Sequence, residues 1–193
     1  MLTTDKPAHA SARAAALPPE ERRSMIVAAV VPLLIEQGEA VTTRQIADAA
    51  GIAEGTIFRA FPDKDSVLRA AIEAVFDGEP LEQALAEIDR DRPLVEVLAD
   101  AVALLQARLV SIFRVVSSVG PRFLGSKRRN LVVSPWLEDL LGEHTKDLAL
   151  KPKEAARVLQ SLTLAVTHPS LAEKPMPPAR IVQLFLHGAG TGA

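Results

Sequence analysis

The chain has 193 residues, of which 48% are hydrophobic and none is cysteine, and its formal net charge at pH 7 is −2. This length allows one or two domains with a sizeable core. The absence of cysteine excludes a disulfide framework, a thiolate nucleophile and a cysteine-ligated metal site. No basic and then apolar segment resembles a signal peptide, so a cytoplasmic location is expected.

The first predicted helix follows residues 1–18, which we expect to be a flexible tail because they carry no helical apolar stripe. Pro19 and the acids after it are typical of a helix start, where proline is tolerated and negative charge meets the positive end of the helix dipole. Apolar residues then recur at helical spacing as far as Gly38. Pro32 lies inside this helix and should kink it or cost stability.

Two short helices joined by a tight turn are predicted next. Thr42 and Gln45 form a capping-box pattern at the start of the first helix, and Gly51 ends it where a left-handed backbone is favourable. The second helix, over residues 53–60, has an apolar side made by Ile57 and Phe61 and an outer side made by Glu54, Thr56 and Arg59. Such a pair of helices can present a helix end to the major groove of DNA.

The rest of the chain shows helical periodicity and no strand pattern, so an all-α fold is predicted. Asp63 is expected to cap a helix over residues 64–76, and Asp91 to cap a long helix that begins near Pro93. Apolar side chains nearly encircle this long helix, which is typical of a central position in a domain. Charged residues interrupt it too often for a membrane span. Further helices are expected over residues 81–88, 135–148, 153–167 and 178–187, with a loop over 120–134 that contains Lys127-Arg128-Arg129.

Several short motifs occur together at the two predicted helices and just after them: T-T-R-Q-I-A, A-G-I, G-T-I-F and F-P-D-K-D-S-V-L. With the preceding helix that ends at Gly38, they resemble the N-terminal domain of the TetR family of bacterial transcriptional regulators over about residues 20–75. The resemblance implies a three-helix helix-turn-helix DNA-binding domain at residues 19–77. It also implies a helical domain at residues 78–193 for effector binding and dimerisation.

The resemblance also places candidate DNA contacts on this sequence: Thr43, Arg44, Glu54, Gly55, Thr56, Phe58, Arg59 and Lys64. Of these, Arg44, Thr56 and Lys64 are expected to contact phosphates. Two positions depart from the family pattern. Phe58 stands where a tyrosine is usual, so a phenolic hydrogen bond to phosphate is absent, and Ala53 stands where a capping Ser or Thr is common. The uncapped amides of that helix could instead receive a DNA phosphate.

Two roles are left open by the residues alone. Glu54 either stabilises the start of its helix or accepts a hydrogen bond from cytosine N4, and Arg59 contacts either guanine or a phosphate. Residues 1–78 carry eight Lys or Arg against eleven Asp or Glu, a net charge of −3. Because nucleic-acid-binding domains are usually basic, we expect the local placement of a few cations to matter, and non-specific affinity to be modest.

The C-terminal region shows no comparable motif, so its role follows from the resemblance. We expect a ligand-responsive regulator, most often a repressor, that leaves a palindromic DNA operator when a small apolar effector binds. The two C-terminal helices are expected to form a homodimer. The effector pocket is expected between the long helix and the helix that contains the only tryptophan, with these lining residues: Leu105, Leu109, Phe113 and Trp136.

Other classes of protein are less well supported. No G-x-S-x-G, H-E-x-x-H or G-x-x-x-x-G-K motif occurs, so an enzyme is not expected. The four histidines share no metal-ligand spacing, and neither a metal nor a cofactor is expected. The remaining alternative is a helical protein-interaction module that uses the helix-turn-helix as a protein surface.

Overall fold

The computed structural model describes residues 18–124 and 133–188, and within these stretches the chain forms helices, turns and loops without a strand. The all-α prediction is therefore confirmed for this part of the chain. Residues 1–17 of the expected tail and the run Lys127-Arg128-Arg129 lie outside the described residues. The helices are α1 (Pro19–Gln37), α2 (Thr43–Ala50), α3 (Glu54–Ala60), α4 (Lys64–Phe76), α5 (Glu79–Ala86), α6 (Leu94–Ser118), α7 (Pro121–Leu124), α8 (Pro135–Glu143), α9 (Pro152–Ala165) and α10 (Pro178–His187).

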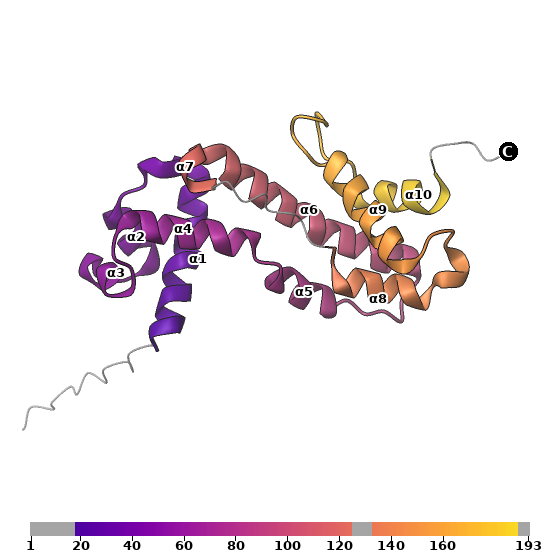
Figure 1. Ribbon diagram of the computed structural model, residues 1–193, viewed down its shortest axis with the longest axis horizontal. Coiled ribbons are helices and arrows are strands. Elements are labelled where there is room, and N and C mark those ends of the chain that lie inside the picture. The colour runs from indigo at the N-terminus through magenta and orange to yellow at the C-terminus, as the bar shows by residue number, and fades with distance from the viewer. Residues whose placement is uncertain (1–17, 125–132, 189–193) are drawn as a thin grey trace, which may run out of the picture.

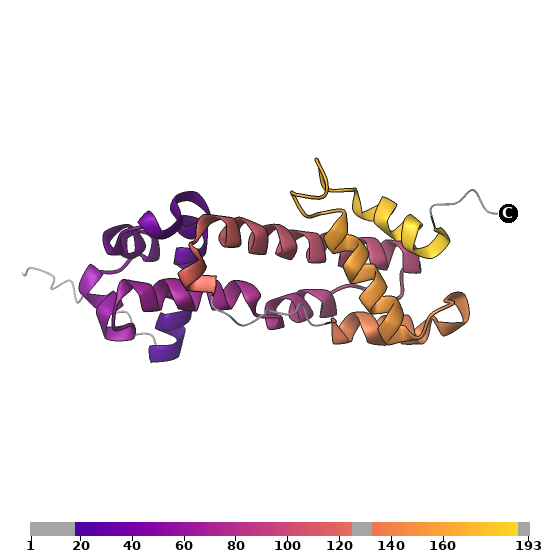
Figure 2. The same ribbon diagram turned by 45° about the horizontal axis from the view of Figure 1, so that its top comes forward.

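The molecule is elongated, and α6 connects two groups of helices (Figure 1). Helices α1 to α4 gather around the C-terminal end of α6, whereas α8, α9 and α10 gather around its N-terminal half. The same arrangement is visible after rotation (Figure 2). Helix α6 can serve both groups because it is long, and the two ends of its buried side pack into different clusters.

Two hydrophobic clusters form the core, and α6 contributes to both. Val115 and Val119, with Phe123 of α7, pack into the cluster formed by α1 to α4. The N-terminal half of α6 packs with α5, α8, α9 and α10. Burying one large apolar side chain stabilises a fold by roughly 1.5–3 kcal/mol, so these contacts join the two groups firmly. The packing thus crosses the boundary expected near residue 78.

A close approach between α6 and the 3₁₀ turn Gly38–Ala40 positions the helices that follow. Gly38 has a φ of 59°, and a Cβ atom there would lie 2.2 Å from the carbonyl oxygen of Ser118. The Glu39 carboxylate accepts a hydrogen bond from the N–H of Gly120, and it pairs with the Arg122 guanidinium at 2.9 Å. We call the contacts of Glu39 with Gly120 and Arg122 the clasp.

Some helix boundaries differ from those expected. Asp91 does not cap α6, because Pro93 holds the N-cap position and the N–H of Asp91 donates to the Asp89 carboxylate at 3.0 Å. Helix α8 ends at Glu143, before residue 148, and a short 3₁₀ turn, Thr145–Asp147, follows it. Pro32 lies inside α1 with its side chain exposed, and nothing in the structure explains it.

Within the described ranges, no helix has both the length and the apolar character needed to cross a membrane.

Candidate nucleic-acid interface

The start of α2 is fixed by the capping box expected from the sequence. The N–H of Gln45 donates to the Thr42 hydroxyl oxygen at 3.2 Å, and the N–H of Thr42 donates to the Gln45 side-chain oxygen at 2.8 Å. The amide nitrogen of Gln45 also donates to the Gln37 side chain at 2.7 Å. These bonds tie the first turn of α2 to the end of α1, so the side chains of Thr43 and Arg44 start from a fixed backbone.

The turn between α2 and α3 depends on Gly51. Its backbone is left-handed, with φ 66° and ψ 32°, and its N–H donates to the carbonyls of Ala47 and Asp48. The N–H of Ile52 donates to the carbonyl of Ala47 at 3.0 Å. Glycine adopts this conformation without steric cost, and the turn therefore sets the angle at which α3 leaves α2.

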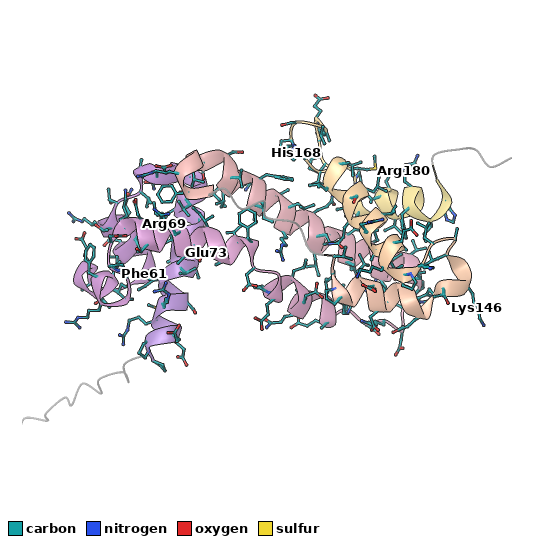
Figure 3. All side chains as sticks on the ribbon, viewed as in Figure 1. Phe61, Arg69, Glu73, Lys146, His168 and Arg180 are labelled. Carbon is teal, nitrogen blue, oxygen red and sulfur yellow. The ribbon has the colours of Figure 1, made fainter. Side chains whose placement is uncertain are left out.

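Helix α3 has one buried side and one exposed side. Ile57 and Phe61, which follows the helix, are almost completely buried in the cluster of α1 to α4 (Phe61 is labelled in Figure 3). Phe58 is 50% exposed, Glu54, Gly55 and Arg59 are exposed, and Thr56 is half-buried. The orientation expected for the second helix is confirmed, and Ala53 provides no side-chain cap.

Two of the candidate residues contact each other. The Thr43 hydroxyl donates a hydrogen bond to the Glu54 carboxylate, which joins the first turn of α2 to the first turn of α3. A negative charge at this place also suits the positive end of the α3 dipole. Glu54 therefore has a clear role within the protein, and its remaining oxygen lone pairs can still accept from a base.

Lys64 is positioned differently from the other candidate cations. Its ammonium group donates to the carbonyls of Glu39 at 3.0 Å and Val41 at 3.1 Å, and its side chain is half-buried. Lys64 thus holds the segment between α1 and α2 against the start of α4. An ammonium group has three donors, so one donor remains available for a phosphate.

Arg44 and Arg59 are the two candidate cations with no polar partner in the described parts of the chain, and both are exposed. Gly55 lies between them in the sequence, and a Cβ atom at this position would meet nothing within 4 Å. The fold itself therefore does not require glycine there. A glycine at an exposed helix start permits close approach of another backbone.

The sequence analysis missed the role of Arg23 on α1. Its guanidinium donates to the carbonyl of Ala60 at 3.0 Å and lies 4.1 Å from the centre of the Phe61 ring. It satisfies a carbonyl at the C-terminal end of α3 and stabilises that end of the helix dipole. An arginine on a helix carries no sequence signal for a contact with a residue so distant in the chain.

The four candidate ligand-pocket residues are not brought together. A cavity of about 600 Å³ lies beside α6, but of the four only Phe113 lines it. Leu105 and Trp136 are buried in the second hydrophobic cluster, and Leu109 is buried without lining the cavity. The Arg90 guanidinium covers the Trp136 ring at 4.7 Å. Leu105 and Trp136 thus pack in the core, and of the four residues the cavity beside α6 is lined by Phe113.

The described residues provide no obvious centre for metal chemistry. No group of three or more His, Cys, Asp or Glu side chains within them is placed to hold a metal ion. The perturbed pKa values belong to structural contacts. The hydrogen bond from Gly120 and the adjacent Arg122 lower the pKa of Glu39, and hydrogen bonds from Ser66 lower the pKa of Asp63, which caps α4.

Residues 26–71 match the family described as bacterial regulatory proteins, tetR family. This stretch contains α2 and α3 entirely, together with the parts of α1 and α4 that pack on them. The fold and the match define a helix-turn-helix DNA-binding regulator. By this match, residues 26–71 carry the DNA-binding domain of the TetR family of bacterial transcriptional regulators.

Solved structures of similar fold extend over most of the chain. A tetR-family transcriptional regulator from Streptomyces coelicolor is 22% identical, covers 89% of this chain and 79% of its own, and has a TM-score of 0.58. A transcriptional regulator from Rhodococcus sp. Rha1 is 19% identical, with coverages of 85% and 93% and a TM-score of 0.55. The TetR-like regulator LfrR from Mycobacterium smegmatis, solved in complex with proflavine, is 21% identical, with coverages of 89% and 99% and a TM-score of 0.53. At these identities the likeness concerns the fold. A comparison with curated proteins gave no match.

Proposed function

We propose that this protein binds a palindromic double-stranded DNA operator as a homodimer, acts as a repressor, and is released by a small, mostly apolar effector. The observation that carries this proposal is the exposed side of α3, where Arg59 and Gly55 lie opposite the buried Ile57. Together with Arg44 at the start of α2, this side offers unpaired cations and open backbone to a DNA groove. Binding to DNA also implies a cytoplasmic location.

Dimerisation is supported by the apolar surface of α9 and α10. Val158 is 41% exposed, and several neighbours are half-buried: Leu162, Leu164, Leu184, Phe185 and Leu186. A second copy of this surface would cover these side chains, as two-fold dimers commonly do. One recognition helix reads only a few base pairs, and a dimer reads two half-sites about 34–36 Å apart or a multiple of that distance.

Regulation by a small molecule is supported by the cavity beside α6. Its volume of about 600 Å³ suits a small organic ligand. The similar fold of LfrR was solved with proflavine bound, which agrees with a small-molecule effector in this case. Release requires that the effector bind more tightly to the conformation that fits the operator poorly.

The decisive experiment selects bound duplexes from a random DNA pool and then maps the protected bases. We expect two half-sites related by a two-fold axis, tight binding in the presence of competitor DNA, and a steep dependence of affinity on salt. Failure to enrich any duplex would refute the DNA-binding role and favour a protein-interaction surface on α2 and α3. Transcription from a promoter carrying the selected site then distinguishes repression from activation.

A further inference from the structure

The cavity beside α6 lies where three parts of the fold meet. Its walls come from Ile35 near the end of α1, from the α6 residues Val110, Phe113, Arg114, Ser117 and Ser118, and from the connection between α9 and α10. On the α6 wall, the ring of Phe113 meets the ring of His168, which lies in the α9–α10 connection, edge to face with centroids 4.4 Å apart (His168 is labelled in Figure 3). Apolar groups form much of the lining, as in most ligand sites.

Two hydrogen-bond donors of this cavity have no acceptor among the residues that the structure describes. The Arg114 guanidinium is exposed and forms no hydrogen bond or ion pair with the described residues. Thr167 is 2% exposed, and its hydroxyl oxygen accepts from the amide of Gln106 at 3.0 Å, which leaves the hydroxyl hydrogen without an acceptor. A buried donor without an acceptor is costly, and an occupant carrying an acceptor would remove that cost.

We propose that this cavity binds a small amphipathic anion, with an apolar body against Phe113 and a carboxylate or similar acid group held by Arg114 and Thr167. A guanidinium matches the geometry of a carboxylate and forms strong charge-assisted hydrogen bonds with it. The one acid in the lining, Glu173, lies exposed on the α9–α10 connection. A cationic ligand would pair with Glu173 alone, would be repelled by Arg114, and would leave the buried Thr167 hydroxyl without an acceptor.

The position of the cavity gives such a ligand access to the DNA-binding helices, and this part of the inference rests on the proposed function. Ile35 lies on α1, shortly before the buried Gly38 of the 3₁₀ turn, and the carbonyl of Ser118 packs against Gly38. A ligand between Ile35 and Ser118 therefore contacts both segments that the clasp joins. If the ligand prefers a wider separation of α1 and α6, it shifts the population away from the clasped arrangement.

The test compares three probes of equal length that differ in charge: octanoate, octanol and octylamine. Their affinities for the full-length protein are measured by calorimetry, without DNA. We expect octanoate to bind more tightly than octanol, and octylamine to bind more weakly than both. Arg114→Gln should weaken octanoate binding about tenfold or more, which is the change expected from losing one charge-assisted hydrogen bond, and should leave octanol binding unchanged.

Glu173→Gln is the matched control, because it removes a charge from the same cavity without removing a donor. Octanoate should bind this variant as tightly as the wild type or more tightly. Equal affinity for the three probes, no binding of octanoate, or loss of binding in Glu173→Gln and not in Arg114→Gln would each overturn the proposal. The thermal unfolding of both variants shows whether they fold as the wild type does.

A separate measurement with the selected operator tests the regulatory consequence. Octanoate should lower the operator affinity of the wild type and have a much smaller effect on Arg114→Gln. Charge-selective binding of octanoate with no effect on operator affinity would support the anion site and overturn its regulatory role. Absence of any operator would instead refute the proposed function and leave the calorimetric result standing.

Discussion

The Glu39 carboxylate accepts a hydrogen bond from the backbone N–H of Gly120, a residue 81 positions further along the chain. Glu39 lies in the turn that precedes α2, and Gly120 lies between α6 and α7. The contact therefore connects the helix that spans the molecule directly to the start of the helix-turn-helix. Its effect on stability and on DNA binding can be separated experimentally.

Glu39→Gln is expected to lower the thermal stability at neutral pH, because glutamine keeps an acceptor for Gly120 but loses the ion pair with Arg122. The pKa of Glu39 is lowered in the folded state, first by the hydrogen bond from Gly120 and then by Arg122. Its stabilising effect is therefore complete above the ordinary carboxyl pKa and is lost as the pH falls through the lower folded value. The difference in Tm between the two proteins should shrink in acid.

The control for this prediction is Glu36→Gln, which changes an exposed acid near the end of α1 that has no partner among the described residues. It should change Tm little at any pH. The Tm difference between the wild type and Glu39→Gln could instead stay constant from neutral pH to a pH below the ordinary carboxyl pKa. That result would show that the charge of Glu39 does not stabilise the clasp.

Lys64→Ala is expected to affect folding as well as DNA binding. The ammonium group holds two carbonyls between α1 and α2, and hydrogen bonds of this kind contribute about 1 kcal/mol each at a half-exposed site. Chemical denaturation should show a loss of about 1–2 kcal/mol. An unchanged unfolding free energy would mean that Lys64 acts only on DNA.

Arg44→Ala should weaken operator binding without changing stability, because the side chain is exposed and has no partner in the described part of the protein. Loss of one phosphate contact reduces the slope of log affinity against log salt by about one. Binding titrations at several salt concentrations measure this slope. A variant with the wild-type slope would remove Arg44 from the interface.

Arg59→Ala should change which sequences are bound more than how tightly they are bound on average. Arg59 is exposed on α3, the helix that the turn at Gly51 orients. A base contact by an arginine discriminates by about 1–3 kcal/mol, so repeated selection should show relaxed preference at one or two positions. Arg44→Ala serves as the comparison, because a phosphate contact carries no base preference. An unaltered preference would assign Arg59 to a phosphate.

Gly55→Ala is expected to stabilise the protein and to weaken operator binding. A Cβ atom there meets nothing within 4 Å, and alanine in a helix is favoured over glycine by about 0.5–1 kcal/mol. If DNA approaches the start of α3 closely, the added methyl group blocks it. Thermal unfolding and operator titration give the two readings. A stabilised variant with wild-type operator affinity would show that DNA does not approach Gly55.

Val158→Glu should produce a folded monomer that no longer binds the operator tightly. Val158 is 41% exposed on α9, so the charge is tolerated in a monomer and is buried only in a dimer. Leu171→Glu is the control, since Leu171 is 71% exposed outside the helices. Sedimentation of both variants and of the wild type measures the assembly. A wild type that is monomeric at micromolar concentration, yet still protects a full palindrome, would refute dimerisation.

The local features of the helix-turn-helix could be predicted because they depend on near neighbours. The capping box at Thr42 and Gln45, the left-handed turn at Gly51 and the inward direction of Ile57 all follow from spacings of a few residues. Backbone conformation and helical periodicity act over such distances. The boundaries of α6 and α10 were close to those expected for the same reason.

The contacts that decide what each side chain does could not be read from the sequence. Lys64 binds the carbonyl of Glu39, Arg23 reaches Ala60, and Glu39 pairs with Arg122, over separations of 25, 37 and 83 residues. The cavity formed at Phe113 and Arg114, away from Trp136, because the packing of α6 against α1 and α9 determines which of its sides is covered. Amino-acid spacing determines which side of a helix is apolar. Only the tertiary structure decides which partner covers each side, since α6 is apolar around most of its circumference.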